Sequence, residues 1–343
     1  MTVTVETLNA QAMARWDSYV QKAPAATFFH RAGWKTVLER AFGHKTYFIY
    51  AQQDGEIVGV LPLAQVKSAL FGNTLSSLPF CVYGGIVADN ESAEAALRNE
   101  ACRLAESFQV GALELRCMAS SGANWPVKDL YYTFRKSIDP CVEVNLKAIP
   151  NRQRAMVRKG LKEGLCSEWD EGIARLYRVY SESVRNLGTP VFSSKYLRIL
   201  REEFADDCSV LMITHDGQDV AAVLSFYFRD EVIPYYGGST AAARSLKGVN
   251  HVLYWELMRL SAEQGYCVFD FGRSKAGTGP FSFKKNFGFE PQPLPYEYYL
   301  VKSSDMPDVN PLNPKYRLMI STWSKLPLPV ANFVGPFLAR SLG

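Results

Sequence analysis

The chain has 343 residues, 48% of them hydrophobic and 21% charged, and its formal net charge is +4. This length favours two domains of roughly 150 residues each, and the composition is typical of a soluble globular protein rather than a fibrous or disordered one. Seven scattered cysteines without a C-x-x-C pair argue against a disulfide framework and a zinc site, so we expect a cytoplasmic protein without a metal. No apolar run approaches the ~20 residues of a membrane span, and the N-terminus lacks a secretion signal.

The first half of the chain predicts two helices, a hairpin, a strand, a helix and a final strand. The two helices cover about 5–22 and 28–42, because apolar residues recur there at helical spacing. Asp54-Gly55 separates two β-rich runs, and this dipeptide favours a tight type I′ turn. A further run ends on the motif Tyr83-Gly84-Gly85, and a helix then leads to the strand at 112–117.

The second half repeats this order of elements. Its hairpin turns on Asp216-Gly217, and the following run carries a second copy of the motif, Tyr236-Gly237-Gly238. Two shared motifs in matching order indicate a duplicated unit. We therefore predict an α/β fold with domains at 1–148 and 149–302 and a tail at 303–343, and we expect the two motifs in equivalent strands.

The segment Tyr266–Glu290 is the strongest candidate for a functional site. Alternation predicts a strand that places Phe269 and Phe271 on one face and Asp270 on the other. After Gly272 the sequence is typical of a flexible basic loop, whose backbone amides could surround a phosphate or carboxylate. The alternative is a solvated loop after an edge strand. The candidate binding residues of this loop are Arg273, Lys275, Gly277 and Gly279.

Asp270 ends the predicted strand beside two cations of the loop. A carboxylate in this position could orient or deprotonate an attacking amine, and we name it as a catalytic candidate. The alternative is that it only neutralises the neighbouring cations. The histidines at 30, 44, 215 and 251 show no ligand or dyad spacing, and we nominate none of them.

The order of elements is similar to the acyltransferase fold of the GNAT superfamily, present twice. With the basic helix Asn151–Leu165 between the copies and the closing segment FDFGRSK…FSFKKNFGFEP, the chain resembles the FemAB/FemX family, whose members transfer amino acids from aminoacyl-tRNA to peptidoglycan precursors. Together with the tail, this segment looks like the FemAB-like proteins associated with exosortase and exopolysaccharide systems. The resemblance implies two tandem GNAT-like domains with mixed, mostly antiparallel sheets.

The resemblance also implies roles for residues of the second copy. Phe283-Lys284 falls where the family has a Phe-Lys pair at the reaction centre, so Lys284 would stabilise an oxyanion and Phe283 would contact substrate. A surface lysine paired with Glu290 is the alternative. Ser183-x-Arg185 matches the family's contacts to a sugar nucleotide, although Arg185 could instead cap a helix. Tyr236 and Asn250 complete the binding candidates; Asn250 ends AARSLKGVN, which has only Gly248 as a phosphate-loop glycine.

The implied reaction is attack by an amine or hydroxyl on an activated acyl group, with aminoacyl-tRNA favoured as co-substrate, acyl-CoA as the alternative and no tightly bound cofactor. The acceptor would be a sugar-nucleotide or lipid-linked glycan precursor of the cell wall or an exopolysaccharide. The coiled-coil arm of FemA- and FemB-type members is missing, which weakens the case for tRNA binding of that style. A protein of a different class, a catalytically silent scaffold of such a system, would bind none of these donors.

Two basic segments lie outside this candidate site. The helix Asn151–Leu165 could meet tRNA phosphates or an anionic leaflet, but a charged helix between domains is usually only solvated. The tail from Lys315 to Gly343 has four cations and no acid. Its aromatics predict either a peripheral contact with the inner membrane leaflet or a brace packed on one of the domains, and prolines 327, 329 and 336 exclude one continuous helix.

Overall fold

The computed structural model describes residues 2–68, 72–306 and 314–342, with the backbone alone for 314–318. The chain forms two compact units. Unit 1 comprises residues 1–131, 293–308 and 340–343, and unit 2 comprises residues 132–292 and 309–339. The borders of these units differ from the predicted domain borders. Residues 132–148 belong to unit 2, and residues 293–302, predicted for the second domain, belong to unit 1.

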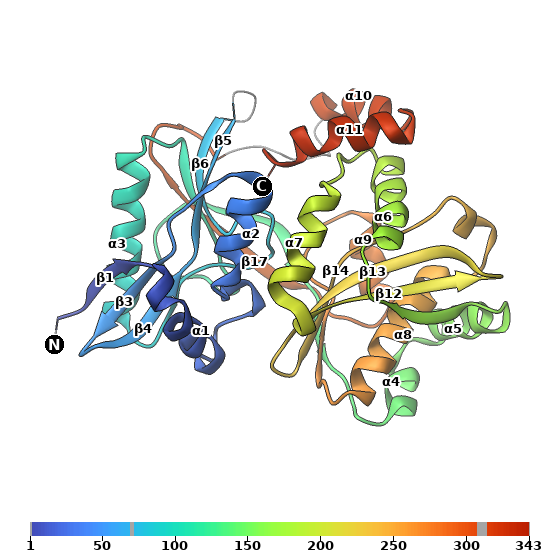
Figure 1. Cartoon of the computed structure of the whole chain (residues 1–343). Helices are drawn as coiled ribbons and strands as arrows, with labels where there is room; N and C mark the ends of the chain where they lie inside the picture. The colour runs from blue at the N-terminus through green and yellow to red at the C-terminus, as the bar shows by residue number, and fades with distance from the viewer. Residues whose placement is uncertain (1, 69–71, 307–313, 343) are drawn as a thin grey trace. The chain divides into compact units, whose positions relative to one another are not determined.

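Unit 1 contains two sheets with helices on both sides (Figure 1). One sheet has the order β1-β3-β4-β7, and in the other β9, β17, β8, β6, β5 and β2 follow one another. The bounds are β1 Thr4–Thr7, α1 Met13–Lys22, α2 Gly33–Phe42, β2 Lys45–Thr46, β3 Ile49–Gln53, β4 Glu56–Leu61, β5 Leu63–Ser68, β6 Gly72–Ser77, β7 Val87–Ala88, α3 Glu91–Ser107, β8 Ala112–Arg116, β9 Val127–Thr133 and β17 Gln292–Leu300.

Unit 2 contains one sheet of six strands in the order β10-β15-β14-β13-β12-β11. Helices α6 and α7 cover one face, and α4, α5 and α8 cover the other (Figure 1). The bounds are β10 Arg135–Ser137, α4 Val142–Ala148, α5 Asn151–Lys162, β11 Cys166–Asp170, α6 Ala174–Asn186, α7 Ser194–Phe204, β12 Cys208–His215, β13 Gln218–Phe228, β14 Glu231–Ser239, α8 Val249–Glu263, β15 Val268–Asp270, α9 Gly279–Asn286, α10 Pro314–Trp323 and α11 Leu328–Ala339.

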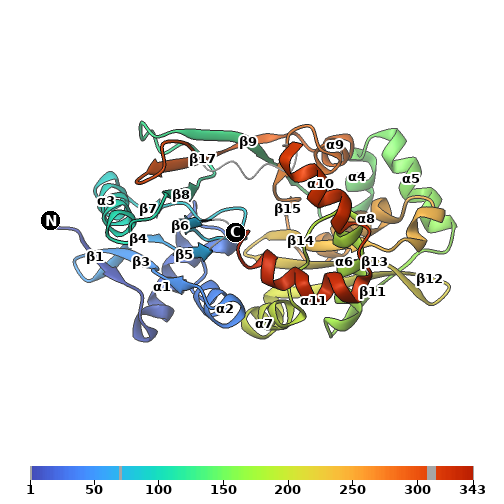
Figure 2. The same cartoon turned by 90° about the horizontal axis from the view of Figure 1, so that it is seen from above.

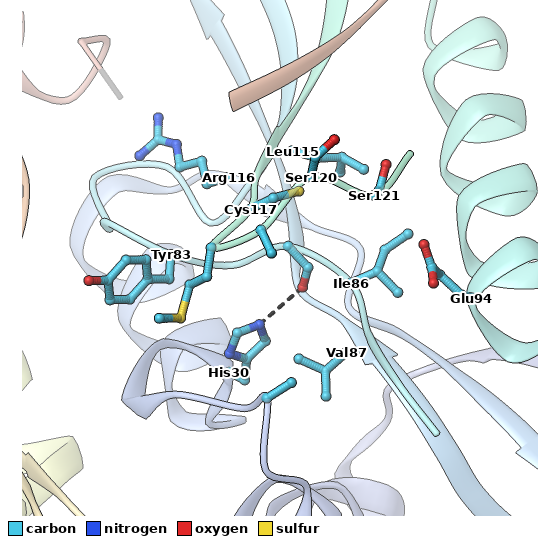
Figure 3. Close-up of a pocket in the computed structure, with 14 residues that line it drawn as sticks. His30, Tyr83, Ile86, Val87, Glu94, Leu115, Arg116, Cys117, Ser120 and Ser121 are labelled. Atoms are coloured by element: carbon cyan, nitrogen blue, oxygen red, sulfur yellow. Dashed lines mark hydrogen bonds between the residues drawn. The ribbon is translucent and has the colours of Figure 1, made fainter. Parts of the chain in front are cut away.

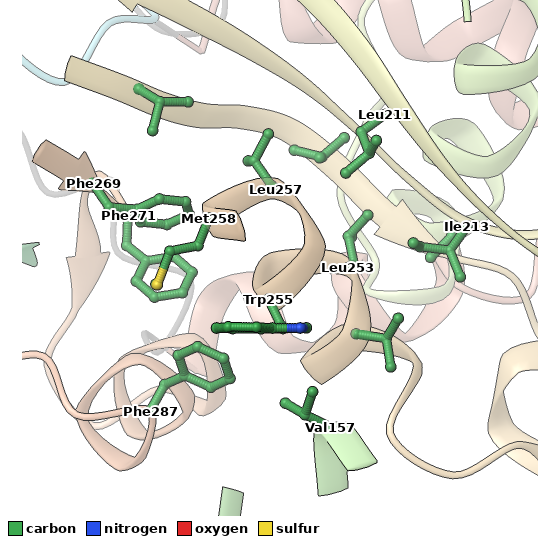
Figure 4. Close-up of a cluster of buried hydrophobic side chains, with 14 of the residues drawn as sticks. Val157, Leu211, Ile213, Leu253, Trp255, Leu257, Met258, Phe269, Phe271 and Phe287 are labelled. Carbon is green, nitrogen blue, oxygen red and sulfur yellow. The ribbon is translucent and has the colours of Figure 1, made fainter. Parts of the chain in front are cut away.

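The core of unit 2 lies between the sheet and α8 (Figure 4). Helix α8 turns Leu253 and Leu257 toward Leu211 and Ile213 of β12, and its buried Trp255 lies on the other side, beside Val157 and Phe287 (Figure 4). Phe269 and Phe271 join the same core, as the predicted alternation requires, and the basic helix α5 packs on α8 through its buried residues Val157 and Gly160. Packing against α8 therefore holds β12, β13 and β14 in place on this face of the sheet.

The duplication is visible in the strand pairing of each unit. In unit 1, β6 is antiparallel to β5 and parallel to β8, and in unit 2, β14 is antiparallel to β13 and parallel to β15. Both Asp-Gly turns adopt the predicted left-handed conformation, with φ of 52° and 86° at Asp54 and Gly55 and of 48° and 74° at Asp216 and Gly217.

The two Tyr-Gly-Gly motifs do not occupy equivalent strands, and this expectation was wrong. Tyr236–Gly238 lies within β14, whereas Tyr83–Gly85 lies in the segment between β6 and β7. The first strand ends early because Leu78 and Phe80 have φ of 61° and 70°, which turn the backbone out of the sheet.

The C-terminal tail forms two helices rather than one, as its prolines predict (Figure 2). Both helices belong to unit 2, where α11 packs on α6. Trp323 at the end of α10 is only 7% exposed, and the Arg185 side chain donates from Nη1 to the carbonyl oxygen of Leu326 at 3.2 Å. Part of the tail thus braces unit 2.

Candidate functional site

A cavity of about 500 Å³ lies in unit 2 at the C-terminal end of β14. It opens where β14 and β15 have separated, because these parallel strands pair only at Glu231–Val232 and Val268–Phe269. Its volume falls within the usual range of small-molecule sites. The lining residues are Ser183, Asn186, Leu187, Gly237, Gly238, Ser239, Thr240, Arg244, Asn250, Leu253, Tyr254, Gly279, Pro280, Phe283 and Lys284.

Lys284 borders this cavity but is not the loop cation that the sequence predicts. It belongs to helix α9, it is 9% exposed, and its Nζ donates to the carbonyl oxygens of Phe271, Gly272 and Arg273 at 2.7, 3.0 and 3.2 Å. A lysine ammonium has three N–H donors, so these bonds use all of them. The alternative of a surface lysine paired with Glu290 is excluded, because Lys284 is buried and directed at the backbone of the preceding loop.

Burial lowers the pKa of Lys284 to about 7, although Asp270 opposes this shift. The cause is desolvation, because a charged ammonium is disfavoured away from water. The rings of Phe134 and Phe271 lie 5.6 and 5.9 Å from Nζ and recover part of the lost hydration. Lys284 is therefore a lining residue whose charge changes near neutral pH.

Asp270 lies at the end of β15, as predicted, but its side chain is completely buried. Its carboxylate accepts bonds from the Thr133 hydroxyl at 3.1 Å and from the Gly272 amide at 2.7 Å, and it pairs with Arg135 Nε at 3.4 Å. It does not line the cavity. The role of a base in contact with an acceptor is therefore not supported, and the carboxylate instead fixes the turn after β15.

Arg135 also pairs with Glu231, so two acids share one guanidinium beneath this turn. Burial, followed by the charge of Asp270, raises the pKa of Glu231 to about 8. Neither Arg135 nor Glu231 was named from the sequence, since both lie in ordinary β-strands far from the motif. They are recognised only from the strand pairing, in which Arg135 lies opposite Asp270 and Glu231 lies opposite Val268.

The predicted flexible loop is short and ends in a helix. Ser274–Lys275 forms the short strand β16, and Thr278 caps α9, where Gly279 and Pro280 reach the cavity. Gly277 has φ of 75° and is exposed, so it serves the turn, and neither it nor Arg273 nor Lys275 lines the cavity. The sequence missed α9 because FSFKKNF is rich in aromatics and follows two glycines and a proline.

Ser183, Asn250 and Phe283 do line the cavity, as predicted. Ser183 sits beside the motif glycines: its Oγ accepts from the Ser239 amide at 3.3 Å, and a Cβ added at Gly238 would lie 2.3 Å from it. Asn250 is in the first turn of α8, whose N-cap Gly248 has φ of 75° and provides no side-chain cap. No side chain therefore satisfies the first amides of this helix, although Gly248 and Val249 are themselves buried.

Two predicted binding residues face elsewhere. Arg185 holds the tail through Leu326 and does not line the cavity. Tyr236 is 7% exposed, its hydroxyl lies 2.8 Å from that of Tyr196, and it packs among the rings of Tyr180 and Phe192. Its ring therefore packs among side chains of α6 and α7, whereas Gly237 and Gly238, further along β14, border the cavity. Arg244 was missed, although it lies within AARSLKGVN, and its charge beside a helix start was the available signal.

Unit 1 has a smaller cavity of about 210 Å³ beside its own Tyr-Gly-Gly motif (Figure 3). His30 lies against Gly85 there, with Nε2 3.0 Å from the carbonyl oxygen. Arg116 is tied to Glu114 and to the carbonyl oxygen of Cys81 at 2.6 Å, and burial raises the pKa of Cys117 to about 12. These groups are engaged with the protein itself, so this cavity offers little reactive chemistry.

Comparison with known proteins identifies the fold. Residues 149–285 match the family model described as acetyltransferase (GNAT) domain. The structure is similar to that of FemX, with a TM-score of 0.70 and 16% identity over 92% of this chain and 100% of the other. It is also similar to the C-terminal domain (DUF2156) of a putative lysylphosphatidylglycerol synthetase from Agrobacterium fabrum, with a TM-score of 0.57 and 15% identity over 92% and 97% of the two chains.

A third similar structure is a tandem GNAT protein from the clavulanic acid biosynthesis pathway, with a TM-score of 0.56 and 13% identity over 89% of this chain and 100% of the other. No curated protein matched the sequence. The predicted α/β tandem GNAT-like fold with mixed sheets is confirmed. The domain and the fold together support an acyl- or aminoacyltransferase.

Among the described residues, no group of three or more His, Cys, Asp and Glu side chains is placed to hold a metal ion. Within the same part of the chain, none of the helices has the length and apolar character needed to span a bilayer.

Proposed function

We propose that the chain transfers an aminoacyl or acyl group from an activated donor to an amine or hydroxyl of a cell-wall or exopolysaccharide precursor, in the cavity of unit 2. The observation that carries this proposal is the separation of β14 from β15 above a cavity lined by Gly237–Thr240, Arg244 and Asn250. Main-chain N–H and C=O groups of β14 beyond Val232 can there form hydrogen bonds with an extended donor. The GNAT-domain match and the FemX-like fold support the same chemistry.

In the transfer step, the acceptor nitrogen or oxygen attacks the donor carbonyl carbon. The new bond to carbon forms, the bond to the ribose oxygen of tRNA or the sulfur of CoA breaks, and the acceptor proton passes to the leaving group. Lys284 holds the carbonyls of residues 271–273 beside this reaction, so its first contribution is to position the loop. To stabilise an oxyanion directly, it would have to release one of these carbonyls.

Aminoacyl-tRNA is the favoured donor, by resemblance to the FemAB/FemX family. One observation favours acyl-CoA instead: the start of α8 has no side-chain cap, and Arg244 lies in the same cavity. A pyrophosphate would find uncapped amides and a guanidinium there. Partners of the reaction would be a sugar-nucleotide or lipid-linked glycan precursor, with tRNA in the first case.

The test is transfer of radiolabel to a panel of nucleotide-sugar and lipid-linked precursors, from aminoacyl-tRNA in one series and acetyl-CoA in the other. We expect label to move from aminoacyl-tRNA, and Arg244→Ala to need about tenfold more donor for the same rate. Transfer from acetyl-CoA alone would establish the second donor. If neither donor bound or reacted, the chain would be a scaffold and the proposed function would be wrong.

A further inference from the structure

Helix α11 is apolar on its outward face as well as on the face that it buries. Ala331, Gly335 and Ala339 form the buried side. Phe333 and Phe337 are 74% and 62% exposed, whereas Trp169, also among the exposed large hydrophobic residues, is 37% exposed. The exposed positions of α11 are all apolar: Pro329, Val330, Phe333 and Phe337. A helix on a water-facing surface normally carries polar residues there.

This outward face is held in a fixed position within unit 2. The Asn332 amide donates to the Ser181 hydroxyl of α6 at 3.4 Å, and Gly335 approaches so closely that an added Cβ would lie 3.0 Å from Val191. Trp323 is buried just before α11. Because these contacts anchor the opposite face, Phe333 and Phe337 project from the unit as a rigid pair, with ring centroids 6.0 Å apart.

The charge of the same segment indicates what covers this face. Residues 309–343 contain no Asp or Glu, and exposed Lys325 and Arg340 precede and follow α11. Apolar aromatics flanked by cations without acids suit the boundary between acyl chains and anionic headgroups. We propose that the outward face of α11 docks the protein on a membrane surface that contains anionic lipids.

The tail helices pack on the segment that follows the rim of the unit 2 cavity, α10 on Gly188 and α11 on Val191. Leu187, which is 70% exposed, lines the cavity at the end of α6. Its neighbour Gly188 contacts α10, where an added Cβ would lie 2.4 Å from Ile320. A membrane bound by α11 would therefore lie close to the cavity rim and within reach of a lipid-borne substrate. The docking itself does not depend on the proposed reaction.

The experiment is co-sedimentation of the full chain with vesicles of phosphatidylglycerol and phosphatidylcholine, compared with vesicles of phosphatidylcholine alone. We expect binding to the anionic vesicles only, with a loss as salt is raised. The double variant Phe333→Ser, Phe337→Ser should bind at least about tenfold more weakly, since it removes two large apolar side chains from the interface. Both side chains are exposed, so the variant should unfold at the same temperature as the wild type.

The matched control is the double variant Val144→Ser, Leu161→Ser, which removes apolar side chains of 47% and 42% exposure from α4 and the basic helix α5. It should bind vesicles as the wild type does. The proposal is overturned if the wild type fails to sediment with anionic vesicles, or if the control loses as much binding as the α11 variant. Sedimentation velocity without lipid measures the oligomeric state. If the wild type does not bind lipid but forms a dimer, and the Phe333→Ser, Phe337→Ser variant is a monomer, a second copy of the chain covers this face and the proposal is overturned.

Discussion

The two units present the same motif to cavities of very different character. In unit 1, Gly84 and Gly85 pack against backbone and Cys117, and the cavity of about 210 Å³ is lined by groups already bonded to the protein. In unit 2, Gly237 and Gly238 border a cavity of about 500 Å³ with Arg244 and Asn250. In both units the motif glycines leave no room for a Cβ, and in unit 2 both of them also form part of the wall of the larger cavity.

The largest expected effect concerns Lys284, which has no counterpart in the cavity of unit 1. Lys284→Met should lower the free energy of unfolding by about 3 kcal/mol, because three buried carbonyls lose a charged donor, and it should abolish transfer. Lys285→Met, at the exposed neighbouring position of α9, is the control and should behave as wild type in urea unfolding and in activity. Normal stability of Lys284→Met would show that the loop is held by other contacts.

The second prediction separates the two motifs directly. Gly84→Ala should destabilise the chain by about 2 kcal/mol, because the added Cβ would lie 2.7 Å from the carbonyl oxygen of Ser77. Gly238→Ala places its Cβ 2.3 Å from Ser183 at the cavity wall, so transfer should fall more than stability. Thermal unfolding and transfer rates measured on both variants make the test. If Gly84→Ala and Gly238→Ala lost the same stability and the same activity, the two motifs would not differ in function.

The third prediction concerns donor binding. Arg244→Ala should raise the KM for the donor about tenfold and leave the unfolding temperature unchanged, since Arg244 is exposed and lines the cavity. Arg31→Ala, at a partly buried arginine of unit 1, serves as the comparison and should not change this KM. A lower kcat with an unchanged KM would show that Arg244 acts in the transfer step and not in donor binding.

The fourth prediction is a pH dependence of stability. The pKa of Lys284 is about 7 in the folded chain, and in the unfolded chain it has its ordinary value of 10.5. Between pH 7 and 10.5 the Lys284 amine is therefore protonated mainly in the unfolded chain. The stability of the wild type relative to Lys284→Met should therefore fall as pH drops from 10.5 to 7 and stay level below 7. Chemical unfolding of both proteins at a series of pH values measures this difference. A difference that does not vary with pH would contradict the lowered pKa.

Local sequence signals predicted local structure well. The Asp-Gly turns, the basic helix and the alternation at Phe269 and Phe271 depend on near neighbours and are present in the structure. The sequence named Ser183, Asn250, Phe283 and Lys284 as site candidates, and the structure brings all four to one cavity. These residues lie on three different helices, α6, α8 and α9, and the family resemblance grouped residues that are far apart in the sequence.

The sequence could not predict which polar side chains are buried. Lysine and aspartate are mostly exposed in proteins, so the burial of Lys284 and Asp270 contradicts the usual expectation, and only partners distant in sequence explain it. Thr133 and Arg135 come from the far end of the first repeat. Tyr236 was named as a binding residue, whereas its ring packs among those of Tyr180, Phe192 and Tyr196.

The place of β17 has a consequence for synthesis of the protein on the ribosome. Strand β8 pairs antiparallel with β17 through Arg116 and Tyr296, yet β17 is made after every strand and helix of unit 2 up to α9. At roughly 5–20 residues per second, translation from β8 to β17 takes about 10 to 40 s. During this interval the nascent chain carries an unpaired strand edge in unit 1, so its later repeat can fold first and the earlier one is completed last.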